Sequence, residues 1–212
     1  MGNSGRPARI LHITFNMGIG GTEQVIRQIV LGLPRKDFSS QVLCIDGFVG
    51  DIGKQLSDEN ITVTALKRSP GFDWKLVCSI RKILRQSNVD VVHCHQYTPW
   101  VYGWLAAIGS GTKVVFTEHG RFHPDRYRYK AVLVNPLIAF TTDAVIAISN
   151  ATKKAMQKYE FIPASRIKVI YNGIEPLERD ESVSKTVRAE LGIPADVTVL
   201  GTMARLDPVK IR

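Results

Sequence analysis

A short apolar run, a glycine-rich loop and a helical pattern open this chain and constrain its fold. The apolar run covers residues 10–15, and Gly18, Gly20 and Gly21 follow it directly. From residue 25 onward, apolar residues recur every three or four positions, which is the spacing of a helix with one buried face. A buried strand, a tight turn and a helix in this order are typical of an α/β fold.

The glycine loop has two interpretations that its residue types leave open. It either holds an anion on backbone N–H groups at the helix N-terminus, or it only packs the helix against the strand. A dinucleotide fingerprint needs a third glycine where Glu23 stands, and Asp46 is loosely spaced for the acidic ribose partner. The loop therefore disfavours a nicotinamide enzyme, and no phosphate-binding G-x-x-x-x-G-K-[ST] motif occurs.

Strand and helix patterns alternate along most of the chain, which predicts a parallel sheet with helices on both faces. We expect an α/β, Rossmann-like sheet of about seven strands. The predicted strands cover residues 9–15, 41–46, 61–66, 89–95, 113–117, 144–148 and 166–171. The predicted helices cover residues 22–33, 51–58, 73–86, 98–108, 126–140 and 149–159, with Thr22 and Ser149 as N-caps and Pro136 as a kink.

The pattern changes after residue 173. We assign residues 1–173 to one domain, 174–183 to a polar, acidic linker and 184–212 to the start of a second domain. A helix is expected at 184–191 and a buried strand at 197–203. Because one helix and one strand cannot form a domain, we expect the second domain to be truncated.

Composition narrows the class of protein. Hydrophobic residues make up 44% of the chain and charged residues 22%, as in a soluble globular protein. No apolar run approaches the ~20 residues that span a bilayer, and the N-terminus lacks a signal-peptide pattern, so we predict a cytoplasmic location. The chain has three cysteines, an odd number, and each lies in a segment with periodic apolar residues. We therefore predict that Cys44, Cys78 and Cys94 are reduced core residues.

The formal net charge of +9 is concentrated in two basic segments, residues 67–85 and 121–130. Such segments suit phosphates, anionic lipid surfaces or nucleic acid, and solvated helix faces are the alternative for the first of them. Tyr127 and Tyr129 lie among the charges of the second segment. Two aromatic residues are too few for a base-stacking surface, so we expect no nucleic-acid partner.

Chemically distinctive residues gather where the predicted strands end. They are the glycine loop after the first strand, His93 and His95 in the fourth, His119 after the fifth and Ser149 after the sixth. In open parallel sheets, ligands bind outside the carboxyl ends of the strands, at the point where the strand order reverses. The pattern therefore predicts a ligand site at this edge.

His93 and His95 point to the same side of their strand and would make half of a metal site. The sequence identifies no third ligand and contains no Asp-x-Asp, so we favour a core or supporting role and expect no metal. His119 either caps the strand end or hydrogen-bonds a polar substrate. Arg205 and Lys210 flank a turn after a strand, where two cations suit a diphosphate.

Six segments, taken together and in order, resemble the glycosyltransferases of family four, which have the GT-B architecture. The resemblance covers nearly the whole chain. The segments are residues 20–23 (Gly-Gly-Thr-Glu), 90–95 (Asp-Val-Val-His-Cys-His), 117–120 (Thr-Glu-His-Gly), 145–149 (Val-Ile-Ala-Ile-Ser), 169–174 (Val-Ile-Tyr-Asn-Gly-Ile) and 201–210 (Gly-Thr-Met-Ala-Arg-Leu-Asp-Pro-Val-Lys).

The resemblance implies two Rossmann-like domains with a cleft between them, of which this chain holds the N-terminal, acceptor-side one. The family uses a UDP- or GDP-sugar, retains the anomeric configuration and usually needs no metal or other cofactor. Carried over, Gly20 and Gly21 would approach the donor diphosphate, and His119 would touch the donor sugar as the catalytic residue. Arg205 and Lys210 would neutralise the diphosphate, while His95, Arg121, Arg126 and Arg128 are acceptor-side candidates.

The sequence also departs from the family pattern at its C-terminal end. Ala204 stands where the family often has glycine, and Ile211 stands where glycine or asparagine usually opens a helix. The family's Glu-x7-Glu donor motif is absent. These departures predict that residues 1–212 are inactive alone.

The expected function is transfer of a sugar, with retention, from a nucleotide-sugar to a glycan, lipid-linked or other cell-envelope acceptor. The alternative is a non-catalytic binding module, as half of a split transferase or as a membrane-surface platform for the acceptor. The basic segment at residues 121–130 motivates that alternative, together with peripheral contact with the anionic inner face of a membrane.

Overall fold

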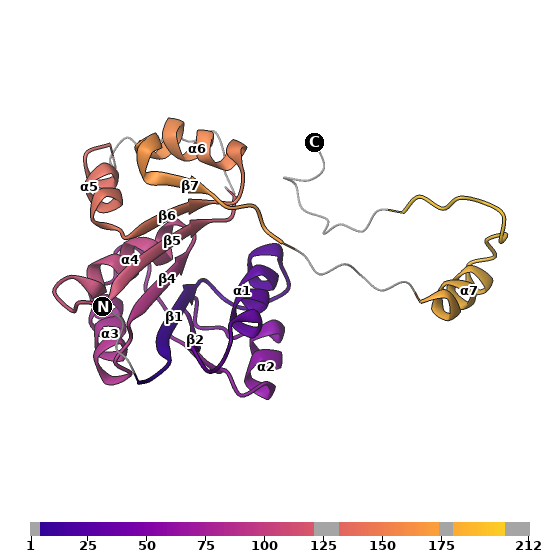
Figure 1. Ribbon diagram of the computed structural model, residues 1–212, viewed down its shortest axis with the longest axis horizontal. Coiled ribbons are helices and arrows are strands. Elements are labelled where there is room, and N and C mark those ends of the chain that lie inside the picture. Colours follow the sequence, from indigo (N-terminus) through magenta and orange to yellow (C-terminus); the bar gives the residue numbers. More distant parts are fainter. Residues whose placement is uncertain (1–4, 121–131, 174–179, 202–212) are drawn as a thin grey trace. The chain divides into compact units, whose positions relative to one another are not determined.

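The structure is a computed structural model, and it describes residues 5–120, 132–173 and 180–201. The chain forms two compact units, Met1–Asn172 and Gly173–Arg212. The first unit contains a seven-stranded sheet in the order β3-β2-β1-β4-β5-β6-β7, and every strand pair is parallel. The predicted α/β, Rossmann-like fold is confirmed (Figure 1).

All seven predicted strands are present, shifted by a few residues at their ends. They are β1 (Ala8–Thr14), β2 (Phe38–Cys44), β3 (Thr62–Ala65), β4 (Val91–His95), β5 (Lys113–Glu118), β6 (Ala144–Ala147) and β7 (Ile167–Val169). The helices are α1 (Gly21–Gly32), α2 (Asp51–Asp58), α3 (Trp74–Gln86), α4 (Tyr97–Ala107), α5 (Val134–Thr141), α6 (Asn150–Glu160) and α7 (Glu181–Glu190), and a 3-10 turn spans Ala164–Arg166.

The strand order reverses between β1 and β4. After β1 the chain adds β2 and β3 on one side, and α3 then returns it to the other side of β1, where β4 to β7 follow in order. In the parallel pairing of β1 with β4, His12 lies opposite His93. The carboxyl ends of β1 and β4 therefore meet at the point where ligands of such sheets bind.

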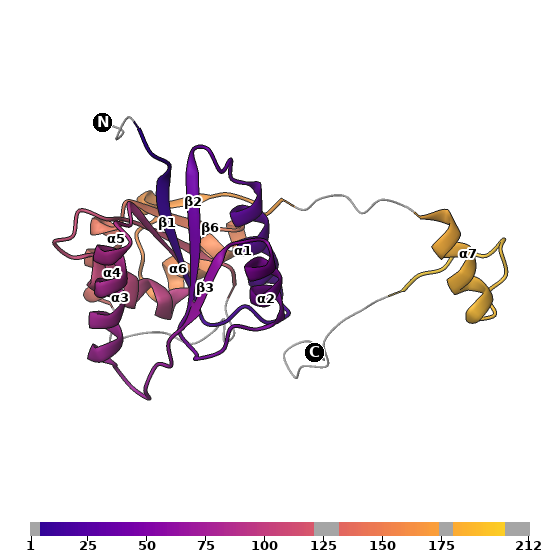
Figure 2. The same cartoon turned by 90° about the horizontal axis from the view of Figure 1, so that it is seen from below.

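The two faces of the sheet carry separate apolar clusters. In Figures 1 and 2, α1 and α2 lie on one side of the sheet, and α3, α4 and α5 lie on the other. Ile26, Val30 and Leu56 of α1 and α2 pack with Val42 and Cys44 of β2. A larger cluster joins α3, α4, α5 and α6 to the opposite face, and it includes Leu11, Ile13, Val92, Cys94, Trp100, Phe116, Ile138 and Met156.

Several predicted helix ends are wrong. Helix α1 begins at Gly21 with Gly20 as its N-cap, so Thr22 is not the cap. Ser149 does cap α6, because its hydroxyl accepts a hydrogen bond from the Thr152 N–H at 3.0 Å. Helix α5 begins at Val134 rather than at residue 126, which places Pro136 in its first turn, where proline costs no helical hydrogen bond. Residues 126–131 of that prediction lie outside the described residues.

The second unit contains α7, which begins three residues before the predicted start because the Asp180 carboxylate caps it by accepting from the Ser182 and Val183 N–H groups. The strand predicted at residues 197–203 is not present over 197–201, the described part of that range. A strand needs a neighbour for its N–H and C=O groups, and an apolar sequence alone does not supply one.

The three cysteines are free thiols, as predicted. Cys44 and Cys94 are buried, and burial raises the pKa of the Cys44 thiol to about 12 and raises that of Cys94 as well. Cys78 is exposed, so its assignment to the core is wrong. Helix α3 buries Leu76, Val77, Ile80 and Leu84, and residue 78 falls outside that face.

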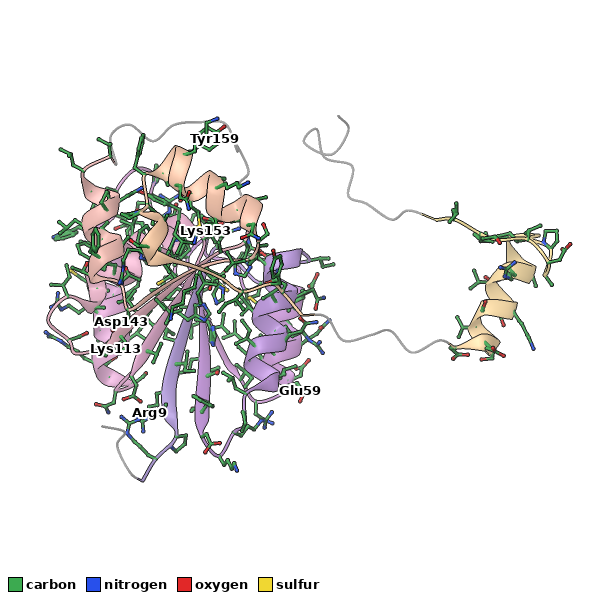
Figure 3. All side chains as sticks on the ribbon, turned by 45° about the horizontal axis from the view of Figure 1, so that its top comes forward. Arg9, Glu59, Lys113, Asp143, Lys153 and Tyr159 are labelled. Atoms are coloured by element: carbon green, nitrogen blue, oxygen red, sulfur yellow. The ribbon has the colours of Figure 1, made fainter. Side chains whose placement is uncertain are left out.

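Charged contacts hold the amino ends of the central strands. Asp90, in the segment that resembles family four, accepts a hydrogen bond from the Arg9 N–H at 2.8 Å and pairs with the Arg6 guanidinium at 2.7 Å. The Lys113 ammonium and the Asp143 carboxylate, which lie side by side in Figure 3, are 2.9 Å apart. These residues start the strands and lie at the edge opposite the predicted ligand site, so Asp90 has a structural role.

No helix within the described ranges combines the length and the apolar character needed to cross a bilayer.

Gly103 allows α4 to approach the sheet, which generates a stability prediction. A methyl group at this buried position would overlap the Cys94 sulfur and touch Ile13 and Val92. We expect Gly103→Ala to lower the free energy of unfolding by about 1–3 kcal/mol, although alanine favours helix by about 1 kcal/mol. Urea denaturation of the purified chain measures this change.

Gly32→Ala is the matched control, since Gly32 also lies in a helix but has open space where a Cβ would project. The control should be neutral or slightly stabilising. Equal stability of the two variants would contradict the close contact between α4 and β4.

Candidate functional site

The structure describes four of the predicted site residues, and all four lie at the carboxyl edge of the sheet. His95 ends β4, His119 directly follows β5, and Gly20 and Gly21 begin α1 after the loop that leaves β1. The other predicted site residues lie outside the described residues: Arg121, Arg126, Arg128, Arg205 and Lys210.

The loop between β1 and α1 is held by the Asn16 side chain within it and by the segment before α2. The Asn16 side chain accepts a hydrogen bond from the Gly18 N–H at 3.0 Å, and Met17 N–H donates to the Val49 carbonyl at 3.0 Å. Gly50 has φ +80°, and a Cβ there would overlap the backbone of Met17 and Gly18. Only glycine permits this approach, so the second βα loop supports the first.

The N-terminus of α1 presents backbone N–H groups that suit an anion, beside the carboxylate of Glu23. Gly20 is the N-cap, it has no side-chain capping bond, and Gly21 in the first turn is exposed. The first N–H groups of a helix lack intrahelical partners and carry the positive end of the helix dipole. The Glu23 carboxylate lies next to the Gly20 Cα, so a bound anion would compete with this side chain for the same positive region.

Three imidazoles form a hydrogen-bonded row from the interior of the sheet to its carboxyl edge. His12 Nδ1 lies 3.1 Å from His95 Nε2, and His95 Nδ1 lies 2.9 Å from His119 Nε2. His12 and His95 are fully buried, whereas the His119 ring is partly exposed. We call His12, His95 and His119 the histidine row.

His12 was not among the candidates from sequence, although it is a histidine inside an apolar strand. It became a candidate only because β1 pairs with β4 in the sheet. The register of this pairing places His12 opposite His93, with ring centroids 5.2 Å apart. Sequence separation alone does not reveal that contact. The rule that ligands bind where the strand order reverses was the available signal.

His93 flanks the row without being part of it. Its ring lies 4.1 Å from that of His95, centroid to centroid, and its Nε2 lies 2.8 Å from the Thr117 hydroxyl on β5. His93 and His95 do share one side of β4, as predicted, and Thr117 lies opposite His95 in the register of β4 with β5. His93 therefore packs against the row and supports it.

Burial keeps these imidazoles neutral. It lowers the pKa of His12 and of His119 to about 4. Burial, followed by repulsion from the neighbouring imidazoles, also holds the pKa values of His93 and His95 well below the usual 6.5. Near neutral pH the cluster is therefore polar but uncharged, and it can accept or donate hydrogen bonds.

Three of these side chains have the composition of a metal site. One nitrogen from each of His12, His93 and His95 lies within 4.8 Å of the others, so the structure provides the third ligand that the sequence did not identify. In the structure these rings hydrogen-bond to each other and to Thr117. Because both nitrogens of His95 are hydrogen-bonded, a metal bound by His95 would have to replace one of these two bonds.

The end of the row is suited to contact with a ligand. His119 Nδ1 is buried and has no hydrogen-bond partner among the described residues. Next to it, the Gly120 N–H donates to the Glu118 carboxylate at 3.1 Å, and Gly120 has φ +124°, a conformation that favours glycine. A buried nitrogen without a partner costs free energy unless a ligand supplies one.

The neutral histidines generate a pH prediction. Because their folded pKa values lie below the unfolded value of about 6.5, their contribution to stability is complete above pH 6.5 and is lost as the pH falls toward 4. Each such histidine contributes up to about 1.4 kcal/mol per pH unit to this slope. We expect His12→Asn to reduce the slope by about that amount between pH 6.5 and pH 5, measured by urea denaturation.

Thr117→Val is the control, because it removes the hydroxyl beside His93 but no titrating group. Its pH slope should match that of the original chain. An unchanged slope in His12→Asn would show that His12 is not held neutral by burial.

Comparison with solved structures supports the fold. A crystal structure of a glycosyltransferase from Rickettsia africae aligns with a TM-score of 0.72 at 20% identity, covering 90% of this chain and 51% of that one. Anabaena Alr3699/HepE, crystallised with UDP and glucose, aligns with a TM-score of 0.69 at 22% identity, covering 86% and 50%.

Sequence comparison identifies the family. The chain is 26% identical over 213 residues to the UDP-Gal:α-D-GlcNAc-diphosphoundecaprenol α-1,3-galactosyltransferase of Escherichia coli. The alignment covers 95% of the chain and 54% of that relative. It is 20% identical over 211 residues to the Staphylococcus aureus capsular polysaccharide biosynthesis glycosyltransferase CapH, covering 96% and 58%. The chain thus spans about half the length of these relatives. Residues 19–177, well over half of the chain, match the model of Glycosyltransferase Family 4, so the chain belongs to that family.

Proposed function

We propose that this chain is the acceptor-side half of a glycosyltransferase that moves a hexose-type sugar, with retention, from a UDP- or GDP-sugar to a glycan, lipid-linked or other cell-envelope acceptor. The observation that carries the proposal is the family match over residues 19–177. The name of the E. coli relative gives it a lipid-linked acceptor, and the name of the S. aureus relative places it in capsular polysaccharide biosynthesis. HepE was crystallised with UDP-glucose.

The family resemblance suggests a role for each site residue. The open N-terminus of α1 at Gly20 and Gly21 binds the donor diphosphate through backbone N–H groups. His119 places Nδ1 against the donor sugar, while Arg205 and Lys210 neutralise the leaving diphosphate. Fixed dipoles and cations stabilise the charge that develops on the departing phosphate, so no metal or other cofactor is required. The family resemblance assigns Arg121, Arg126 and Arg128 to the acceptor. His95 was an acceptor-side candidate too, but it is buried and bonded to His12 and His119, so it acts behind His119 and does not contact the acceptor.

The donor-side half supplies the remaining contacts, and residues 1–212 do not transfer sugar by themselves. The relatives are about twice as long as the matched region, which supports this division. In the second unit, the described residues 180–201 contain one helix and no strand, too little to form a nucleotide-binding sheet.

A transfer assay tests the proposal. Residues 1–212 would be joined to the part of the E. coli galactosyltransferase that this chain does not match, and the product would be assayed with UDP-galactose and GlcNAc-diphosphoundecaprenol. We expect transfer to an α-linked product, with the anomeric configuration read by NMR, and unchanged activity in EDTA. His119→Ala should lower kcat by about 100-fold or more, because a group that aligns the reacting centre is lost.

The exposed Lys36 is the control position, since it lies in the turn between α1 and β2, at the other edge of the sheet. Lys36→Ala should keep full activity. Full activity in His119→Ala would show that His119 is not a catalytic residue. Sugar transfer by residues 1–212 alone would show that the chain does not depend on a donor-side half.

A second candidate function is docking of the acceptor half onto an anionic membrane surface. Helix α5 and the residue before it expose large apolar side chains at positions 133, 137 and 140: Leu133 is 83% exposed, Leu137 61% and Phe140 60%. This spacing sets them on one helix face. The basic segment at residues 121–130 directly precedes them in sequence, and apolar faces next to basic residues suit peripheral binding to anionic lipid.

Vesicle co-sedimentation tests this candidate. The chain should sediment with vesicles that contain anionic phosphatidylglycerol, and much less with vesicles of phosphatidylcholine alone. We expect Leu137→Ser with Phe140→Ser, and separately Arg126→Ala with Arg128→Ala and Lys130→Ala, to reduce the bound fraction several-fold. Each of these cations is worth about 1 kcal/mol near an anionic surface.

Leu191→Ser in the second unit is the control, because Leu191 is also 67% exposed. It should leave sedimentation unchanged. Binding that survives both sets of substitutions would rule out this surface.

A further inference from the structure

The histidine row has a property that follows from counting its protons. A neutral imidazole carries one N–H, so one ring nitrogen donates and the other accepts. Both nitrogens of His95 lie within hydrogen-bond distance of another imidazole, 3.1 Å from His12 and 2.9 Å from His119. Since the rings are neutral near pH 7, one of the two contacts of His95 uses its proton and the other uses its lone pair.

This restriction allows two arrangements that satisfy both bonds. In the first, His12 donates from Nδ1 to His95, and His95 donates from Nδ1 to His119, which then carries its own proton on Nδ1. In the second, His119 donates from Nε2 to His95, and His95 donates from Nε2 to His12, which then carries its own proton on Nε2. The three rings therefore carry the proton either all on Nδ1 or all on Nε2.

The two arrangements differ at the ends of the row, where His12 Nε2 and His119 Nδ1 are both buried and find no partner within the part of the chain that the structure describes. With all protons on Nδ1, His119 presents a donor at the carboxyl edge. With all protons on Nε2, it presents an acceptor. A mixed row would set two lone pairs or two N–H groups against each other at about 3 Å, which forfeits a buried hydrogen bond.

We propose that His12 and His95 are positioning residues that couple the tautomers of the histidine row, so that His119 Nδ1 donates a hydrogen bond only when all three rings carry their protons on Nδ1, and accepts one only when all three carry them on Nε2. His12 acts on the carboxyl edge from inside β1, through His95, without touching a ligand. The row itself stands on its geometry. Its consequence for sugar transfer rests on the proposed function, in which His119 contacts the sugar of the nucleotide-sugar.

The shared tautomer can be observed directly on the 15N-labelled chain. Long-range 1H–15N correlation spectra at pH 7 distinguish a protonated from a bare ring nitrogen in each histidine, and single substitutions assign the rings. We expect His12, His95 and His119 to carry their protons on the same nitrogen, all Nδ1 or all Nε2. A mixed set among the three would overturn the proposal.

Substitution of His12 tests whether it governs His119. His12→Phe leaves His95 Nε2 without a partner, which changes the relative stability of the two arrangements, so the 15N shifts of His119 should differ from those of the original chain. His12→Asn offers a donor and an acceptor at the same position, so it can bond to His95 Nε2 in either tautomer and should bring the His119 shifts back toward those of the original chain. Thr117→Val, which removes only the partner of His93, should leave all three rings unchanged.

His119 shifts that stay identical in His12→Phe would show that His12 has no positioning role. If His12→Phe does not fold, the spectrum of the original chain still decides whether the tautomer is shared. These measurements need neither the nucleotide-sugar nor the sugar acceptor. A failed transfer assay together with a shared tautomer would therefore count against the proposed function and not against the proposed coupling of the histidines.

Discussion

The parallel pairing of β1 with β4 is the contact on which the rest of the site depends. Leu11 and Ile13 of β1 and Val92 and Cys94 of β4 are buried in the larger apolar cluster on one face. Their packing sets the register, because a slip of one residue would turn these side chains to the opposite face. The alternate positions then place His12, His93 and His95 together on the other face.

This arrangement buries several imidazoles whose charged forms are strongly disfavoured. Desolvation holds the pKa values of His12 and His119 near 4, and the bonds between rings recover part of the cost of burying their nitrogens. The result is a polar, uncharged row that ends at the same edge as the open N-terminus of α1. The edge thus combines the positive end of a helix dipole, next to the Glu23 carboxylate, with neutral hydrogen-bonding groups.

Much of the fold was predictable from local patterns. All seven strands are present, because each is a short apolar run bounded by turn residues, and the glycine loop does join β1 to α1. The errors concern features that depend on contacts with other parts of the chain: a helix cap, the burial of a side chain and the formation of a strand. Gly20 rather than Thr22 caps α1, Cys78 is exposed on α3, and residues 197–201 form no strand.

The sequence by itself determined the fold class, the family resemblance and the gathering of Gly20, Gly21, His95 and His119 at one edge, because strand period and strand-end chemistry are local properties. Only the tertiary structure decided that His12 joins them. That contact joins residues 83 positions apart, and it exists because β4 returns to lie against β1. Hydrogen bonds and desolvation depend on such neighbours in space, so the row and its neutral state became evident only in the folded chain.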